Sequence, residues 1–157
     1  MQKQSAGILL YRFRKNIAEV FLVHPGGPFW AKKDLGAWSI PKGEFTGGEE
    51  PLVAAIREFE EETGLKITGQ FIELTPVKQK AGKLILAWAL KADIDTSECK
   101  SNTFEMEWPP KSGKKKEFPE VDKVAWFGIE EAKTKLLEGQ LPLLTELVDK
   151  ISAPGIE

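Results

Sequence analysis

The sequence has one cysteine, one histidine and one tyrosine among its 157 residues. Cys99 alone cannot form an intrachain disulfide, and no cluster of cysteine and histidine offers a structural zinc site, so we expect a reducing, cytoplasmic setting. No apolar run approaches the ~20 residues that a transmembrane helix needs. The N-terminal stretch also lacks the order of a secretory signal, and we expect no membrane partner.

An excess of positive charge is missing too. Lysine and arginine number 22 against 24 aspartate and glutamate residues, which leaves a net charge of -2. Broad nucleic-acid binding depends on such an excess, so we expect no stable nucleic-acid partner. A polyanionic ligand would have to be held by a local site.

Apolar material is plentiful. Hydrophobic residues make up 41% of the chain, with nine phenylalanines and five tryptophans, which is enough for a sizeable core. The length is typical of one domain, and we find no internal repeat and no interdomain linker. We therefore expect residues 1–157 to form a single domain.

The pattern of apolar residues predicts alternating strands and helices. Residues 5–12 and 18–24 predict a hairpin, residues 25–41 a shaped loop with a short strand near 37–40, and residues 51–63 a helix that ends at Gly64. Further predicted elements are strands at 70–79, 83–92, 103–108 and 121–127, a basic loop around 111–117, and helical segments at 130–139 and 141–151 with a break near 139–142.

The predicted helix at 51–63 separates apolar from acidic residues. Leu52, Ile56 and Phe59 share one stripe, which we expect to be buried. Three carboxylates crowd together nearly opposite, at Glu58, Glu61 and Glu62. Like charges at this spacing destabilise a helix, which a divalent cation such as Mg²⁺ or Ca²⁺ would explain, since both prefer hard oxygen ligands. A solvated acidic face is the alternative, and spacing alone does not decide between them.

The longer motif that contains these glutamates decides between the two interpretations. It reads Gly43-x5-Glu49-x7-Arg57-Glu58-Phe59-x-Glu61-Glu62-x-Gly64-Leu65 and resembles the box of the Nudix family, G-x5-E-x7-R-E-U-x-E-E-x-G-U with U a bulky aliphatic residue. The departure is Phe59, which is aromatic and affects packing, not chemistry. The resemblance implies an α/β fold, an α/β/α sandwich around a mixed β-sheet. It also implies a Mg²⁺-dependent hydrolase, with Mn²⁺ able to substitute.

The resemblance also implies roles for the residues of the box. Glu58, Glu61 and Glu62 would bind the metal, with a main-chain carbonyl at Gly43 or the residue before it. Arg57 would orient Glu49 through a bidentate pair, and Glu58 is our first choice as general base.

Outside the box, family members often carry another metal-binding glutamate just before the late Trp-Phe strand. Glu120, six residues ahead of Trp126, holds that place, with Glu117 as second candidate. An ordinary exposed glutamate is the alternative for both.

Substrate binding should draw on cations for phosphates and on aromatic faces for a base. Lys42 is our candidate for phosphate contact, together with Lys115 from the basic loop. Trp38 is our candidate stacking surface, with Trp30 and Trp108 as alternatives. His24 ends a predicted strand, and we expect it to be structural.

The resemblance leaves the substrate open within one class. The Pro-Lys-Gly entry to the box resembles Nudix enzymes that act on dinucleoside polyphosphates, diphosphoinositol polyphosphates, capped RNA ends or nucleoside triphosphates. We expect a dinucleoside polyphosphate of the diadenosine tetraphosphate type, or a nucleoside triphosphate. The alternatives are an RNA 5′-end pyrophosphohydrolase and a non-catalytic Nudix-fold nucleotide sensor.

Overall fold

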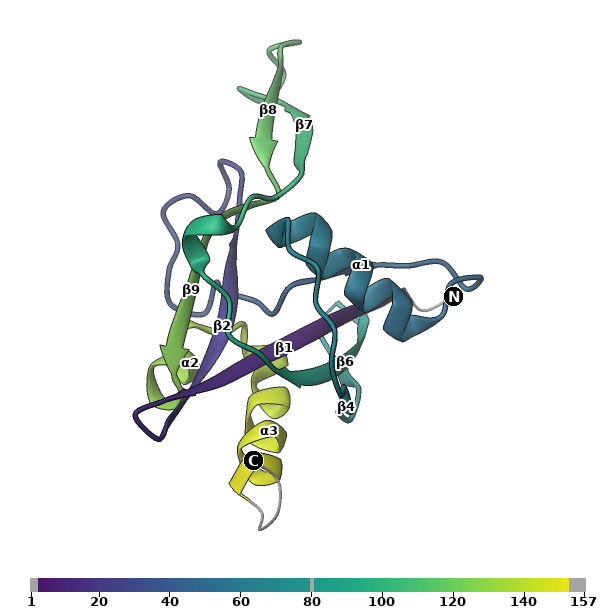
Figure 1. Ribbon diagram of the computed structural model, residues 1–157. Coiled ribbons are helices and arrows are strands. Elements are labelled where there is room, and N and C mark those ends of the chain that lie inside the picture. Colours follow the sequence, from purple (N-terminus) through teal and green to yellow (C-terminus); the bar gives the residue numbers. More distant parts are fainter. Residues whose placement is uncertain (1–2, 80, 153–157) are drawn as a thin grey trace.

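A computed structural model describes residues 3–79 and 81–152. The elements in chain order are β1 (Gln4–Arg14), β2 (Ile17–Pro25), β3 (Lys42–Glu44), α1 (Pro51–Thr63), β4 (Ile72–Glu73), β5 (Val77–Lys78), β6 (Leu84–Lys91), η1 (Thr96–Glu98), β7 (Thr103–Glu107), β8 (Lys115–Pro119), β9 (Val121–Gly128), α2 (Ile129–Lys135), η2 (Glu138–Gln140) and α3 (Leu141–Ser152). Figure 1 shows the central strands with α1 and α3 on different sides.

One mixed sheet organises the domain. Its strand order is β4-β6-β1-β2-β9, with β3 added beside β1 and β5 beside β6. The β1–β6 pair is parallel and the other pairs are antiparallel. In the described residues no helix is long and apolar enough to cross a membrane.

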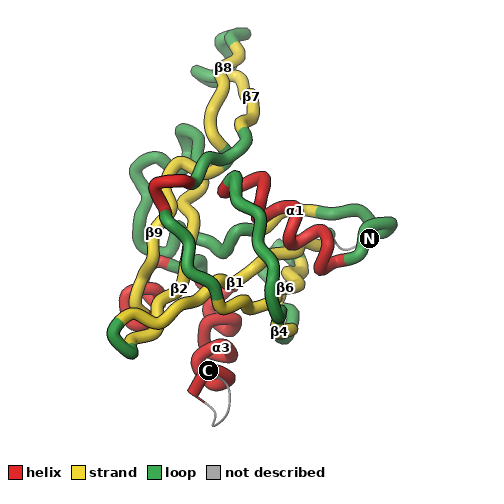
Figure 2. The backbone as a smooth tube through the Cα atoms, viewed as in Figure 1, coloured by secondary structure: helices red, strands yellow, loops and turns green. Residues whose placement is uncertain are grey.

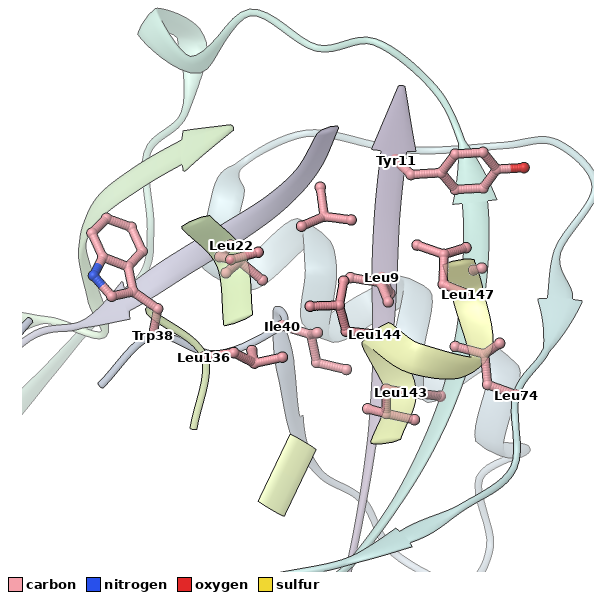
Figure 3. Packing of buried hydrophobic residues seen from close by; sticks show 14 of the residues in the cluster. Leu9, Tyr11, Leu22, Trp38, Ile40, Leu74, Leu136, Leu143, Leu144 and Leu147 are labelled. Carbon is pink, nitrogen blue, oxygen red and sulfur yellow. The ribbon is translucent and has the colours of Figure 1, made fainter. Parts of the chain in front are cut away.

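Alternate side chains of β1 pack in two hydrophobic cores, one on each face of the sheet. Ala6, Ile8 and Leu10 face α1, where they pack with Phe59. Leu9 and Tyr11 face the opposite way, into a cluster with residues of α2 and α3. Figure 3 shows this second cluster, with Leu143, Leu144 and Leu147 of α3 close to Leu9. A sheet buried on both faces confirms the predicted sandwich.

The sheet opens between β1 and β2, and the chain before α1 fills the gap. The two strands pair only from Tyr11↔Val20 to Arg14↔Ile17. Beyond that point the backbone of Ser39 bonds Val23 of β2, and the Pro41 carbonyl accepts from Ile8 of β1. Residues 39–44 are therefore wedged into the sheet, with β3 at the end of the wedge.

Helix α1 has the predicted boundaries. Pro51 occupies the first turn, where its missing N–H is harmless, and Gly64 ends the helix with φ of 78°, in the left-handed region. Phe59 is fully buried, whereas Leu52 and Ile56 only pack against the edge of the core. Glu58 departs from the prediction: it is buried, because it points at β3.

Three other segments correct the sequence-based expectations. The predicted strand at 70–79 is two short strands, β4 and β5, separated around Pro76, which has no N–H to donate. Much of the predicted basic loop is strand β8, which pairs with β7 in a hairpin that projects from the body (Figures 1 and 2). The C-terminal break lies at residues 136–140, and Pro142 falls inside the first turn of α3.

Gly64→Ala should destabilise the fold more than Gly113→Ala. Both glycines have positive φ, 78° and 76°, but a Cβ on Gly64 would lie 2.8 Å from the Lys100 carbonyl oxygen, whereas one on Gly113 would meet no atom within 4 Å. The shared backbone strain costs about 1 kcal/mol, and the collision adds to it only at Gly64. Urea unfolding of the two variants measures the difference; equal losses would contradict the close packing.

Candidate metal and nucleotide site

Gly43 of β3 lies directly against Glu58 of α1. A Cβ built on Gly43 would lie 1.9 Å from Glu58 Oε1, so any larger residue would collide with the carboxylate. The Glu58 side chain is confined from the other direction by Arg57, whose Nη1 donates to Oε2 at 2.7 Å. The bare backbone of Gly43 thus makes room for a buried carboxylate on the sheet.

Arg57 links the loop before α1 to the glutamates. Its Nε and Nη2 donate to the two carboxylate oxygens of Glu49, each at 2.9 Å. This is the bidentate pair predicted from the sequence. Its Nη1 also donates to Glu61 Oε2 at 2.6 Å. The guanidinium lowers the pKa of Glu49, and the carboxylates raise the pKa of Arg57 further above its usual range.

Four carboxylates gather where α1 ends and β9 begins. Burial raises the pKa of Glu62 to about 8, and the charges of Glu120 and Glu58 add to that effect. Burial also raises the pKa of Glu58 and of Glu120, with a further contribution from the charge of Glu61 in both cases. The structure therefore brings Glu120 to the box glutamates, although they are far apart in sequence.

The backbone of Lys42 faces this cluster. Its N–H donates to Glu62 Oε1 at 3.3 Å. A residue in an extended strand presents its N–H and C=O on the same edge, so the Lys42 carbonyl also faces the α1 glutamates. The alternation turns Gly43 toward its partner Ala6 in β1. The geometry thus favours the Lys42 carbonyl over that of Gly43 as an oxygen ligand.

The side chain of Lys42 lies on the other face of the wedge. It lines a cavity of about 670 Å³ between the 26–36 loop, the turn after β5 and the segment joining α2 to α3. Burial and the charge of Lys83 lower the pKa of Lys42, and Glu62 partly offsets this. Trp30 and Lys133 also line the cavity, with an apolar wall of Leu136, Leu137 and Leu141.

The donor set fits a hard divalent cation. All candidate ligands are oxygen atoms, which Mg²⁺ prefers. The missing side chain of Gly43 leaves room for one of the ligating carboxylates, that of Glu58. Across residues 3–79 and 81–152, no three acidic, histidine or cysteine side chains already converge as a ready cation site. Arg57 Nη1 contacts the Oε2 atoms of both Glu58 and Glu61, so a cation that uses these oxygens has to displace that contact.

Trp38 is not a stacking surface, which corrects the sequence-based expectation. It is 5% exposed and belongs to the core beneath α3 (Figure 3). Its indole N–H donates to Asp34, and the rings of His24 and Phe127 pack against it in edge-to-face contacts. No face of the ring is left for a base. Among the tryptophans considered, Trp30 is the one that lines the cavity beside Lys42.

Lys115 is not gathered with the other candidates either. It begins strand β8 at the outer end of the projecting hairpin, paired with Glu107, and it is exposed. Glu117 is exposed in the same strand, opposite Glu105, so Glu120 is the better placed of the two candidate glutamates.

Two features of the site have little signal in the sequence. Gln140 is fully buried, and its side chain accepts from the Ile40 N–H and donates to Ser39, which fixes the wedge to η2, directly before α3. The cavity itself is assembled from segments of the chain as distant as Trp30 and Leu141. In the sequence, only the aromatic or cationic character of the lining residues indicated that they could bind a ligand.

A scan of protein families matches residues 1–147 of this sequence to the NUDIX domain. The chain belongs to the Nudix family. The sequence is 31% identical to Nudix hydrolase 7 of Arabidopsis thaliana over 113 residues, which is 67% of this chain and 38% of that protein. It is 40% identical to an RNA pyrophosphohydrolase of Francisella philomiragia over 55 residues, 34% of this chain and 36% of that protein.

The match thus spans less than two fifths of the length of these curated Nudix relatives. Solved Nudix structures share the fold at low identity. The NUDIX domain of Shewanella oneidensis NrtR, complexed with ADP ribose, superposes with a TM-score of 0.68 at 16% identity, covering 96% of this chain and 89% of that one. A C. elegans Ap4A hydrolase in a binary complex gives 0.63 at 20% identity, covering 92% and 95%.

The buried Glu62 should make the metal-free protein less stable as pH rises. Its pKa is raised from 4.5 to about 8, so folding takes up a proton between these values, and the free energy of unfolding falls across that window. Urea unfolding at several pH values, with a chelator present, measures the slope. Glu62→Gln should make it shallower, whereas Glu60→Gln on the same helix should not. Identical slopes in all three proteins would refute the burial of this carboxyl.

Proposed function

We propose that this Nudix protein is a Mg²⁺-dependent hydrolase that cleaves a pyrophosphate bond in a nucleoside diphosphate linked to another group. The observation that carries the proposal is the gathering of Glu58, Glu61, Glu62 and Glu120 beside the Lys42 backbone. Such a set of carboxylates, one of them buried and three partly buried, is unfavourable unless cations balance it. Nudix hydrolases generally use divalent metal ions, which supports this role.

Glu58, Glu61, Glu62, Glu120 and the Lys42 carbonyl would hold the ion. A bound Mg²⁺ supplies positive charge for phosphate oxygens and lowers the pKa of water at the site. Mn²⁺, with similar oxygen preferences, can take its place.

The surrounding residues have separate tasks in this proposal. Arg57 holds Glu49 by two hydrogen bonds and so ties the loop before α1 to the helix. Glu58 is the proposed general base, because burial has raised its pKa toward the range where a carboxylate takes a proton from water efficiently.

The cavity beside Lys42 is the proposed nucleoside site. Its volume of about 670 Å³ suits a ligand of nucleotide size, and its walls are apolar on one side. Trp30 can stack on a base, while Lys42 lines the same cavity and its ammonium can contact a phosphate. Trp30 thus takes the role first expected for Trp38.

The favoured substrate is a dinucleoside polyphosphate or a nucleoside triphosphate. The fold of an Ap4A hydrolase covers nearly the whole chain, which is compatible with this choice. RNA 5′-end hydrolysis is a second candidate, favoured by the local similarity to RNA pyrophosphohydrolases. A nucleotide sensor without turnover has no evident need for the full carboxylate set. Incubation with a panel of these compounds, followed by mass identification of the products, distinguishes the three.

Glu61→Gln and Glu62→Gln should each lower turnover by at least about 100-fold, because each removes a charged oxygen ligand. The assay is Mg²⁺-dependent release of product from a dinucleoside polyphosphate, with the fold checked by circular dichroism. Glu60→Gln serves as the matched control on the same helix and should keep full turnover. Full turnover in both ligand variants would refute the proposed site.

Trp30→Ala should raise KM for the nucleotide about 5- to 50-fold, the loss of one stacking contact, with a smaller change in kcat. Leu35→Ala is the control, since Leu35 lies on the same loop and is 72% exposed. Steady-state kinetics on both variants separates the two parameters. An unchanged KM in the Trp30 variant would place the base elsewhere.

A further inference from the structure

His24, the only histidine of the chain, is fully buried near the end of β2. Its Nδ1 lies 2.7 Å from Asp122 Oδ1 of β9, and its Nε2 lies 2.6 Å from the main-chain carbonyl oxygen of Lys33 in the 26–36 loop. The ring also packs edge-to-face against Trp38. Both nitrogens therefore make short contacts with oxygen atoms.

Both of these oxygens are acceptors. A main-chain carbonyl has no hydrogen to donate, and neither has an ionised carboxylate. A neutral imidazole carries one N–H and one lone pair, so it could satisfy only one of the two. The other contact would set a lone pair against an oxygen inside the protein, which is costly. A doubly protonated ring donates to both, and the negative charge of Asp122 balances it.

The two contacts join segments of the chain that line two different cavities. Lys33 lies in the loop that carries Trp30, and the Lys33 N–H donates to the Trp30 carbonyl at 3.0 Å. Asp122 lines a second cavity, of about 350 Å³, together with Glu62, and it follows Glu120 by two positions. His24 thus connects the cavity wall at Trp30 with the start of β9.

The other charged groups on the elements that pack around the ring either have ion-pair partners of their own or belong to the residue that pairs with His24 in the sheet. Asp34 at the end of the loop pairs with Lys135 of α2 and accepts from Trp38. Lys123 of β9 is the register partner of His24. Asp122 is therefore the carboxylate that meets the ring.

We propose that His24 is a positioning residue whose doubly protonated ring clamps the 26–36 loop to β9 and so holds Trp30 in place for substrate binding. The effect on substrate rests on the proposed function, whereas the clamp itself does not.

Nitrogen NMR of the histidine ring tests the clamp without any substrate. Because the chain has one histidine, its two ring nitrogens give the only imidazole signals. We expect both nitrogens to carry hydrogen in the folded protein, because each contacts an oxygen acceptor. Lys33→Ala should not alter the pattern, since the contact uses the main chain, whereas Asp122→Asn should give a neutral ring. A ring with one bare nitrogen in the unmodified protein would overturn the proposal.

Kinetics and amide exchange test the positioning. His24→Gln should raise KM for the nucleotide about 5-fold at pH 6.5, the loss of roughly one hydrogen bond, with kcat changed less than about 2-fold. The Lys33 amide should exchange faster in the variant.

The outcomes separate the clamp from the hydrolase. If no nucleotide is hydrolysed by the unmodified protein, the proposed function fails, and ring protonation with Lys33 exchange still decides the clamp. If hydrolysis occurs but His24→Gln keeps both the KM and the Lys33 exchange rate, the positioning role is refuted. Folding of the variant is checked by its urea midpoint.

Discussion

The site depends on one constraint: several carboxylates are held together in a partly buried place where their mutual repulsion and loss of water both oppose ionisation. Glu58 reaches that place only because Gly43 has no side chain, and Arg57 is the cation that contacts both Glu58 and Glu61. Three segments bring oxygen atoms to this place: the helix C-terminus at Gly64, the wedge at 39–44 and the turn at Glu120. A site of this kind is poised for cations.

The fold places the acidic residues and the lined cavity on different faces of the sheet. Helix α1 packs on one face of the sheet and carries the acidic residues, while the other face, with α2 and α3, forms the cavity lined by Trp30 and Lys42. Lys42 joins the two, since its backbone faces Glu62 and its side chain faces the cavity. In the proposed function, phosphate chemistry and base recognition would thus meet at one residue, although the net charge of the chain is -2.

The sequence alone allowed prediction of α1 to the residue, because proline, glycine and periodicity mark its ends, and of the Arg57–Glu49 pair, because the motif spacing implies it. It could not place Trp38, since an aromatic ring packs in a core as readily as it stacks on a base. Strand β8 was missed because lysine-rich segments resemble solvated loops. His24 and Gln140 each contact a main-chain group. Because every residue type carries such groups, these partners could be identified only from the fold.

The opening between β1 and β2 has a structural consequence. Because residues 39–44 are hydrogen-bonded into the sheet itself, the oxygen-bearing backbone at Lys42 shares the rigidity of the core. The β7–β8 hairpin, by contrast, projects from the body of the domain and can accept changes of size or composition. Ligand preference can therefore diversify at the periphery of this architecture while the backbone beside the α1 glutamates keeps its shape.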